Sequence, residues 1–126
     1  MAHQQEIVAL KKFVRATNFL ATSQIYLKKN VLHKRALEHT DIKPRLLGHW
    51  GTCPGINFVY ANVNRLITKH NRSFVYLVGP GHGFPAVQAN LFMEGSLSHF
   101  YPDTIPYNED GITDICQKFS AAYGYP

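Results

Sequence analysis

The sequence has 126 residues, enough for one domain or for a part of a larger one. Hydrophobic residues make up 45% of it and charged residues 17%, a composition that excludes a disordered chain. The net charge is +5, but the basic residues occur singly or in pairs and form no stripe with interleaved aromatic residues. This pattern argues against a nucleic-acid-binding module, which stays as a minor alternative.

The two cysteines and the amino-terminal stretch indicate where in the cell the protein is located. Cys53 and Cys116 lie far apart in the sequence, and the charges at Glu6, Lys11 and Lys12 interrupt any apolar core of a signal peptide. No run approaches the roughly 18 apolar residues of a membrane span. We therefore expect reduced thiols, no membrane contact and a cytoplasmic location. Neither CxxC nor HxxxH spacing is present, so we expect no metal site.

The first predicted element is an amphipathic helix from Gln5 to Lys28, with a break near Thr17–Asn18 as an alternative. Residues 30–47 are polar and irregular. The segment GHWGTCPG, Gly48 to Gly55, is too rich in glycine for regular structure, and Pro54 suits the first turn of the helix that follows. The apolar positions of that helix recur with helical period: Ile56, Val59, Tyr60, Val63, Leu66 and Ile67.

The next predicted element is a strand. Ser73 to Val78 reads SFVYLV, a continuous β-branched and aromatic run typical of a buried strand in a parallel sheet. A glycine-rich turn and a short helix ending near Gly95 follow, then a loop over 96–108. Asn108 is a plausible N-cap for a last helix, on which Cys116 is a core residue. The predicted fold class is α/β, with an incomplete parallel sheet and flanking helices.

The turn GPGHGFP, which begins at Gly79, is the first candidate site. A glycine-rich turn between a strand and a helix directs backbone N–H groups at an anion, and Gly79, Gly81 and Gly83 allow close approach of the backbone. His82 lies where the predicted strand passes into the helix, the usual ligand crevice of an open α/β sheet. The alternative is a tight turn with an exposed histidine.

The second candidate is His49, which is flanked by glycines and followed by Trp50 and Thr52. Histidine transfers protons near neutral pH, so His49 could act as a proton shuttle. The alternative is a buried histidine that satisfies backbone groups. Trp50 is more simply a core anchor than a ligand contact.

These motifs carry a family resemblance. LLGHWGTCPGINFVYANVNRLI, FVYLVGPGHGFPAVQANLFMEGS and the EDGITDICQKFS tail resemble the amino-terminal region of the phosphoketolases. Those enzymes use thiamine diphosphate and phosphate to cleave xylulose 5-phosphate or fructose 6-phosphate to acetyl phosphate and an aldose phosphate. The resemblance implies the amino-terminal part of a thiamine diphosphate-binding, transketolase-like domain, covering residues 1–126 on the diphosphate-binding side.

The resemblance also implies roles for residues. His49 and His82 would be catalytic, and Thr52, Gly79, Gly81 and His82 would bind the cofactor. The intact family uses thiamine diphosphate with Mg²⁺, but this sequence contains no Gly-Asp-Gly segment for the metal. We therefore expect the isolated chain to be inactive and the intact enzyme to be a homo-oligomer. A non-enzymatic remnant is the other alternative.

Two positions depart from the family pattern. Asn62 stands where histidine is usual, on a helix face where the change is expected to be tolerated. Phe84 replaces a small residue after GPGHG. Its ring would either narrow the crevice or pack on a neighbouring helix.

Overall fold

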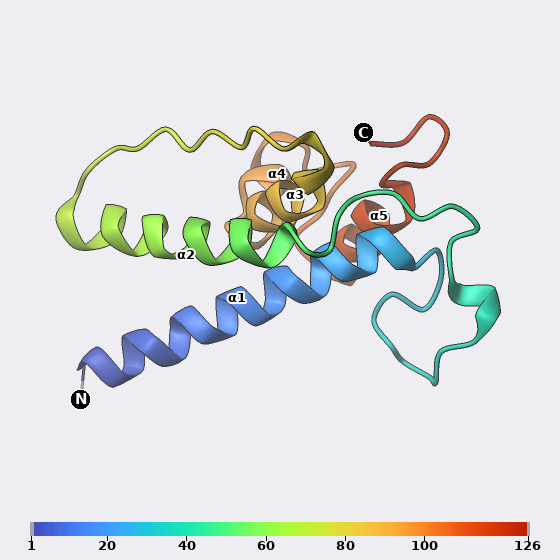
Figure 1. The fold of residues 1–126 in the computed structure, drawn as a ribbon, viewed down its shortest axis with the longest axis horizontal. Helices are drawn as coiled ribbons and strands as arrows, with labels where there is room; N and C mark the ends of the chain where they lie inside the picture. Colours follow the sequence, from blue (N-terminus) through green and yellow to red (C-terminus); the bar gives the residue numbers. More distant parts are fainter. Residues whose placement is uncertain (1, 126) are drawn as a thin grey trace.

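A computed structural model describes residues 2–125, and over this range the chain is helical (Figure 1). The α-helices are α1 (Ala2–Tyr26), α2 (Cys53–His70), α3 (Phe84–Met93), α4 (Ser96–Phe100) and α5 (Glu109–Lys118), and two 3₁₀ turns are η1 (His39–Asp41) and η2 (Gly81–Gly83). Helix α1 runs across the molecule and contacts α2, α3 and α5, while α3, α4 and α5 gather toward its carboxyl end (Figure 1).

Two apolar clusters hold the helices together. The larger joins α1, α3 and α5 with the loops beside them, and its buried members are Leu20, Leu27, Val31, Ala89, Phe92, Ile105, Ile115 and Cys116. The smaller joins α1, α2 and α3 beneath the two candidate loops, and its buried members are Ala21, Ile25, Cys53, Ile56 and Ala86.

A line of asparagine amides crosses the three central helices. The Asn57 amide on α2 donates to Asn18 Oδ1 on α1 at 2.8 Å, and the Asn90 amide on α3 donates to Asn57 Oδ1 at 2.7 Å. Asn57 and Asn90 are fully buried. Because buried amides are costly unless they are paired, these bonds fix how the helices meet.

The predicted parallel sheet is wrong. Within residues 2–125 the structure contains no strand, and its only β-pairs are two isolated bridges, Leu27 with Ile42 and Phe119 with Tyr125. Residues 73–78 are extended, but no other segment of the described chain exchanges backbone hydrogen bonds with them. Nor is this run buried, since Val75 is 87% exposed and Leu77 85%. A β-prone sequence forms a strand only when a partner backbone completes the ladder.

The helical predictions are confirmed, with adjusted ends. Helix α1 runs without a break, and inside it the Thr17 hydroxyl donates to the Phe13 and Val14 carbonyls, each at 3.1 Å, so this buried polar group is paired. Pro54 lies in the first turn of α2. The Asn108 side chain caps α5 by accepting from the N–H groups of Asp110 and Gly111. Helix α4 occupies part of the predicted 96–108 loop and was not predicted.

Candidate functional site

The two predicted histidines come together in the structure. His49 lies in the loop before α2, and His82 lies in η2, directly before α3. Their ring centroids are 5.0 Å apart, and the His49 backbone N–H donates to the His82 carbonyl at 2.9 Å. Two motifs that are separate in the sequence therefore form one site at the amino-terminal ends of two helices.

Thr52 links the two imidazoles. Its backbone N–H donates to His49 Nδ1 at 3.0 Å, and its hydroxyl oxygen lies 3.1 Å from the same nitrogen and 3.3 Å from His82 Nε2. The sequence pointed to Thr52 as a weaker candidate on the diphosphate side. The structure places Thr52 in contact with both histidines, and its role on the diphosphate side stays a prediction.

Gly51 and Gly83, which flank the histidines in the two motifs, lie close to neighbouring side chains in the structure. A Cβ at Gly51 would lie 2.8 Å from His49 Cε1, so only glycine lets the imidazole fold back over the loop. A Cβ at Gly83 would lie 2.4 Å from Ile56 Cδ1, so a larger residue there would displace the end of the Ile56 side chain. The sequence signal was present, because both glycines flank the histidine motifs, but only the fold shows what each one approaches.

Gly79 and Gly81 are exposed and face open space. A Cβ added at either would meet no atom of another part of the described chain within 4 Å. Neither glycine has the positive φ that L-residues avoid. Nothing inside the described chain therefore requires glycine there, which is compatible with close approach of something outside the chain.

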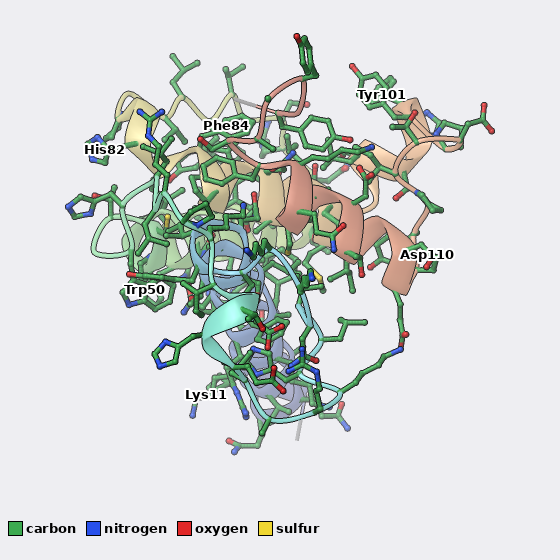
Figure 2. The ribbon with its side chains drawn as sticks, turned by 90° about the vertical axis from the view of Figure 1, so that its right-hand side faces the viewer. Lys11, Trp50, His82, Phe84, Tyr101 and Asp110 are labelled. Atoms are coloured by element: carbon green, nitrogen blue, oxygen red, sulfur yellow. The ribbon has the colours of Figure 1, made fainter. Side chains whose placement is uncertain are left out.

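The site is open to solvent on one side. His49 and His82 are exposed, and Figure 2 shows His82 at the edge of the molecule, on the opposite side from Asp110 at the start of α5. Trp50 is 39% exposed, so its interpretation as a core anchor is wrong. The alternative of a buried His49 is likewise contradicted.

The residues beneath the site are structural. Cys53 is buried in the smaller apolar cluster, and burial raises the pKa of its thiol, which keeps it protonated and poorly nucleophilic. Phe84 stacks on Phe119 with ring centroids 6.3 Å apart. Of the two possibilities for Phe84, the structure supports packing against a neighbouring element.

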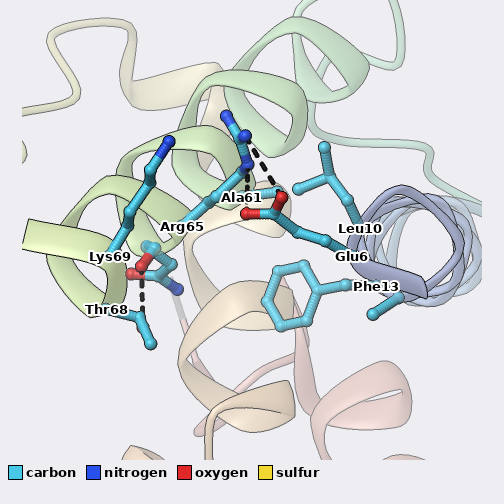
Figure 3. Close-up of a pocket in the computed structure, with 9 residues that line it drawn as sticks. Glu6, Leu10, Phe13, Ala61, Arg65, Thr68 and Lys69 are labelled. Carbon is cyan, nitrogen blue, oxygen red and sulfur yellow. Dashed lines mark hydrogen bonds and ion pairs between the residues drawn. The ribbon is translucent and has the colours of Figure 1, made fainter. Parts of the chain in front are cut away.

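A separate hollow of about 560 Å³ lies between α1 and α2, away from the histidines (Figure 3). Ala9, Leu10, Phe13 and Ala61 give it an apolar lining. The Glu6–Arg65 ion pair bridges the two helices beside it, with Arg65 Nε 2.6 Å from Glu6 Oε1. The residues that line this hollow are ones that pack α1 against α2, and none of them is a predicted site residue.

Residues 2–125 include no group of three histidine, cysteine, aspartate or glutamate side chains arranged to hold a metal ion. In the same part of the chain, no helix has the length and apolar character of a membrane span. The cytoplasmic location expected from the sequence stays a prediction.

Comparisons with known proteins give the family. The XFP N-terminal domain family matches residues 1–126, so the chain belongs to that family. A probable phosphoketolase from Brucella abortus is 45% identical over 122 residues, which are 97% of this chain and 15% of the relative. A probable phosphoketolase from Chlorobaculum tepidum is 44% identical over 122 residues, and one from Nitrosospira multiformis is 48% identical over 121, again covering 15% of each relative.

The recognition of a phosphoketolase amino-terminal region is thus confirmed. The chain spans about 15% of the length of these curated relatives. The match extends through both histidine motifs, because the aligned stretches cover nearly the whole chain.

Proposed function

We propose that this chain supplies two active-site histidines, His49 and His82, to a phosphoketolase that uses thiamine diphosphate. The observation that carries the proposal is the convergence of the two histidine motifs on one open site, linked by Thr52. A pair of exposed imidazoles held in a fixed relation to each other can bind and orient the hydroxyl groups of a sugar.

The residues present suit one side of such a cofactor. The open space around Gly79 and Gly81 leaves room for an anionic group near the amino-terminal end of α3, where backbone N–H groups favour negative charge. We assign Thr52, Gly79, Gly81 and His82 to the cofactor side. Thiamine diphosphate, when bound, supplies the nucleophilic carbon that adds to a ketose carbonyl. Magnesium ligands would come from elsewhere in the intact enzyme.

The proposed substrates are xylulose 5-phosphate or fructose 6-phosphate together with inorganic phosphate, giving acetyl phosphate and an aldose phosphate. His49 and His82 would hold the hydroxyl groups of the ketose while its carbon–carbon bond breaks. The basic balance of the chain, +5, favours anionic sugar phosphates in general but does not select between these two.

A domain substitution tests the proposal. The chain replaces the aligned 122 residues of the Brucella abortus relative, and acetyl phosphate formation is measured with each ketose phosphate and inorganic phosphate. We expect activity from the substituted enzyme. In it, His49→Ala should lower kcat by about 100-fold or more, as for the loss of a proton-transfer or hydrogen-bonding catalytic group.

His70→Ala is the matched control. His70 is exposed at the carboxyl end of α2, the opposite end of the helix from Thr52, and should leave turnover unchanged. A substituted enzyme that folds and binds cofactor but forms no acetyl phosphate would refute the proposal. Equal turnover for the His49 and His70 variants would remove His49 from the site.

The isolated chain is proposed to be inactive, because it offers only one side of the site. Titration calorimetry of the 126-residue protein with thiamine diphosphate and Mg²⁺ should show no binding in the micromolar range. Tight binding would show that the chain holds a complete cofactor site and would contradict this part of the proposal.

A further inference from the structure

The contacts of Thr52 make the two histidines chemically unequal. An imidazole nitrogen that accepts a hydrogen bond carries no proton, and His49 Nδ1 accepts at 3.0 Å from the Thr52 backbone N–H, which is shared with the His49 carbonyl at 3.2 Å. Neutral His49 therefore holds its proton on Nε2. Gly51 supports this geometry, because any larger residue would push the ring away from the Thr52 N–H.

The Thr52 hydroxyl is available to the second histidine. Thr52 is the N-cap residue of α2, yet its side chain makes no capping hydrogen bond to the helix backbone, unlike most threonines in that position. Its oxygen lies 3.3 Å from His82 Nε2. Since the single lone pair of His49 Nδ1 is already used by the backbone N–H, the hydroxyl proton is directed to His82 Nε2.

We propose that Thr52 is a positioning residue that sets opposite tautomers, Nε2–H for His49 and Nδ1–H for His82. This inference rests on the proposed function, in which both histidines face a sugar. Its chemical consequence is specific. Neutral His49 offers a hydrogen-bond donor to a substrate oxygen through Nε2, and it acts as a base at Nε2 only if its Nδ1 bond to Thr52 is replaced.

The test is nuclear magnetic resonance of the whole chain labelled with ¹⁵N-histidine, at about pH 8, above the ordinary histidine pKa of about 6.5. Long-range ¹H–¹⁵N correlations distinguish protonated from unprotonated ring nitrogens. We expect an unprotonated Nδ1 for His49 and an unprotonated Nε2 for His82. The exposed His70 and His99 serve as internal references.

Three variants sharpen the test. Thr52→Val replaces the hydroxyl with a methyl group of similar size, so His82 should shift to a mixture of tautomers while His49 keeps its backbone bond. Thr52→Ser restores the hydroxyl and should restore the spectrum of His82. Gly51→Ala should shift His49 to a mixture, because the added methyl displaces its ring. Circular dichroism checks that each variant keeps its helices.

The inference is overturned if His49 carries its proton on Nδ1, or if Thr52→Val leaves the His82 spectrum unchanged in a folded protein. These outcomes are distinct from failure of the proposed function. If the substituted enzyme is active but the tautomers differ from those expected, the inference about Thr52 is refuted and the proposed function is not. If the tautomers are as expected but the substituted enzyme makes no acetyl phosphate, the inferred hydrogen bonds stand and the proposed function is refuted.

Discussion

Two regions of this molecule differ in whether their polar groups are paired and their apolar groups are buried. Where α1 and α5 end, Lys43 Nζ donates to the carbonyls of Gln24, Cys116 and Phe119 at 2.7, 2.7 and 2.8 Å. We call this the capped end. Residues 73–78, the extended segment, show the reverse, since large apolar side chains point into solvent and the backbone is unpaired by other backbone groups of the described chain.

The capped end also holds a buried carboxylate. Asp41 in η1 is fully buried, and it accepts two hydrogen bonds from the Arg35 guanidinium and one from the Glu38 N–H. The Arg35 hydrogen bonds, followed by that of the Glu38 N–H, lower the pKa of the Asp41 carboxyl. The polar groups of the capped end thus find their hydrogen-bond partners within the chain. Nothing among residues 2–125 explains why the apolar side chains of the extended segment are exposed.

The largest effect should come from breaking the capped end at Lys43. Lys43→Met keeps the length of the side chain but leaves three carbonyls without their donor. Because each unsatisfied buried acceptor costs about 1–3 kcal/mol, we expect the free energy of unfolding to fall by about 3 kcal/mol after partial rescue by water. Urea denaturation measures it, with Lys12→Met on the exposed face of α1 as the control.

The same variant has a pH signature. Burial lowers the pKa of Lys43 to about 8 from an ordinary value of 10.5. Between these values the unfolded chain binds more protons than the folded one, so this group makes stability rise with pH. The stability difference between the native chain and Lys43→Met should therefore grow from pH 8 to 10. A difference that stays constant would contradict the burial of the ammonium group.

A smaller loss should follow from breaking the asparagine line between the helices. Asn57→Ala leaves the Asn18 carbonyl oxygen without its donor and opens a cavity in a fully buried place. We expect a loss of about 2 kcal/mol. The control is Asn62→Ala on the same helix, where the amide donates to the Phe58 carbonyl one turn away and alanine is the better helix former. Equal losses for the two variants would show that the buried amide hydrogen bonds add no more to stability than an amide on the helix surface.

The comparison also explains what the sequence could predict. Helices were predictable because their signals are local: apolar period, Pro54 at the start of α2, and Asn108 as the cap of α5. The asparagine line could not be predicted, since Asn18, Asn57 and Asn90 meet only after three helices pack. For the same reason the sequence predicted both histidine motifs but not their contact, which depends on the close approaches at Gly51 and Gly83.

The predicted strand at residues 73–78 failed for a related reason. Composition reports that a segment is apolar and β-branched, but whether it is paired or buried depends on distant parts of the chain. Within the described chain, one side of the segment is packed and the other is exposed. Tyr76 and Val78 contact the smaller apolar cluster, and the Tyr76 ring meets Tyr60 edge-on at 5.5 Å.

The smallest effect on stability should come from the exposed side of this segment, and residues 77 and 78 allow the exposed and packed sides to be compared directly. Leu77→Ser changes a side chain that is 85% exposed, so it should alter the free energy of unfolding by less than about 0.5 kcal/mol. Val78→Ser, one residue on, removes apolar contact with the cluster and should cost about 1 kcal/mol or more. Urea denaturation of both variants measures the difference. A loss for Leu77→Ser as large as that for Val78→Ser would mean that the outward side is covered in solution, and the contrast with the capped end would disappear.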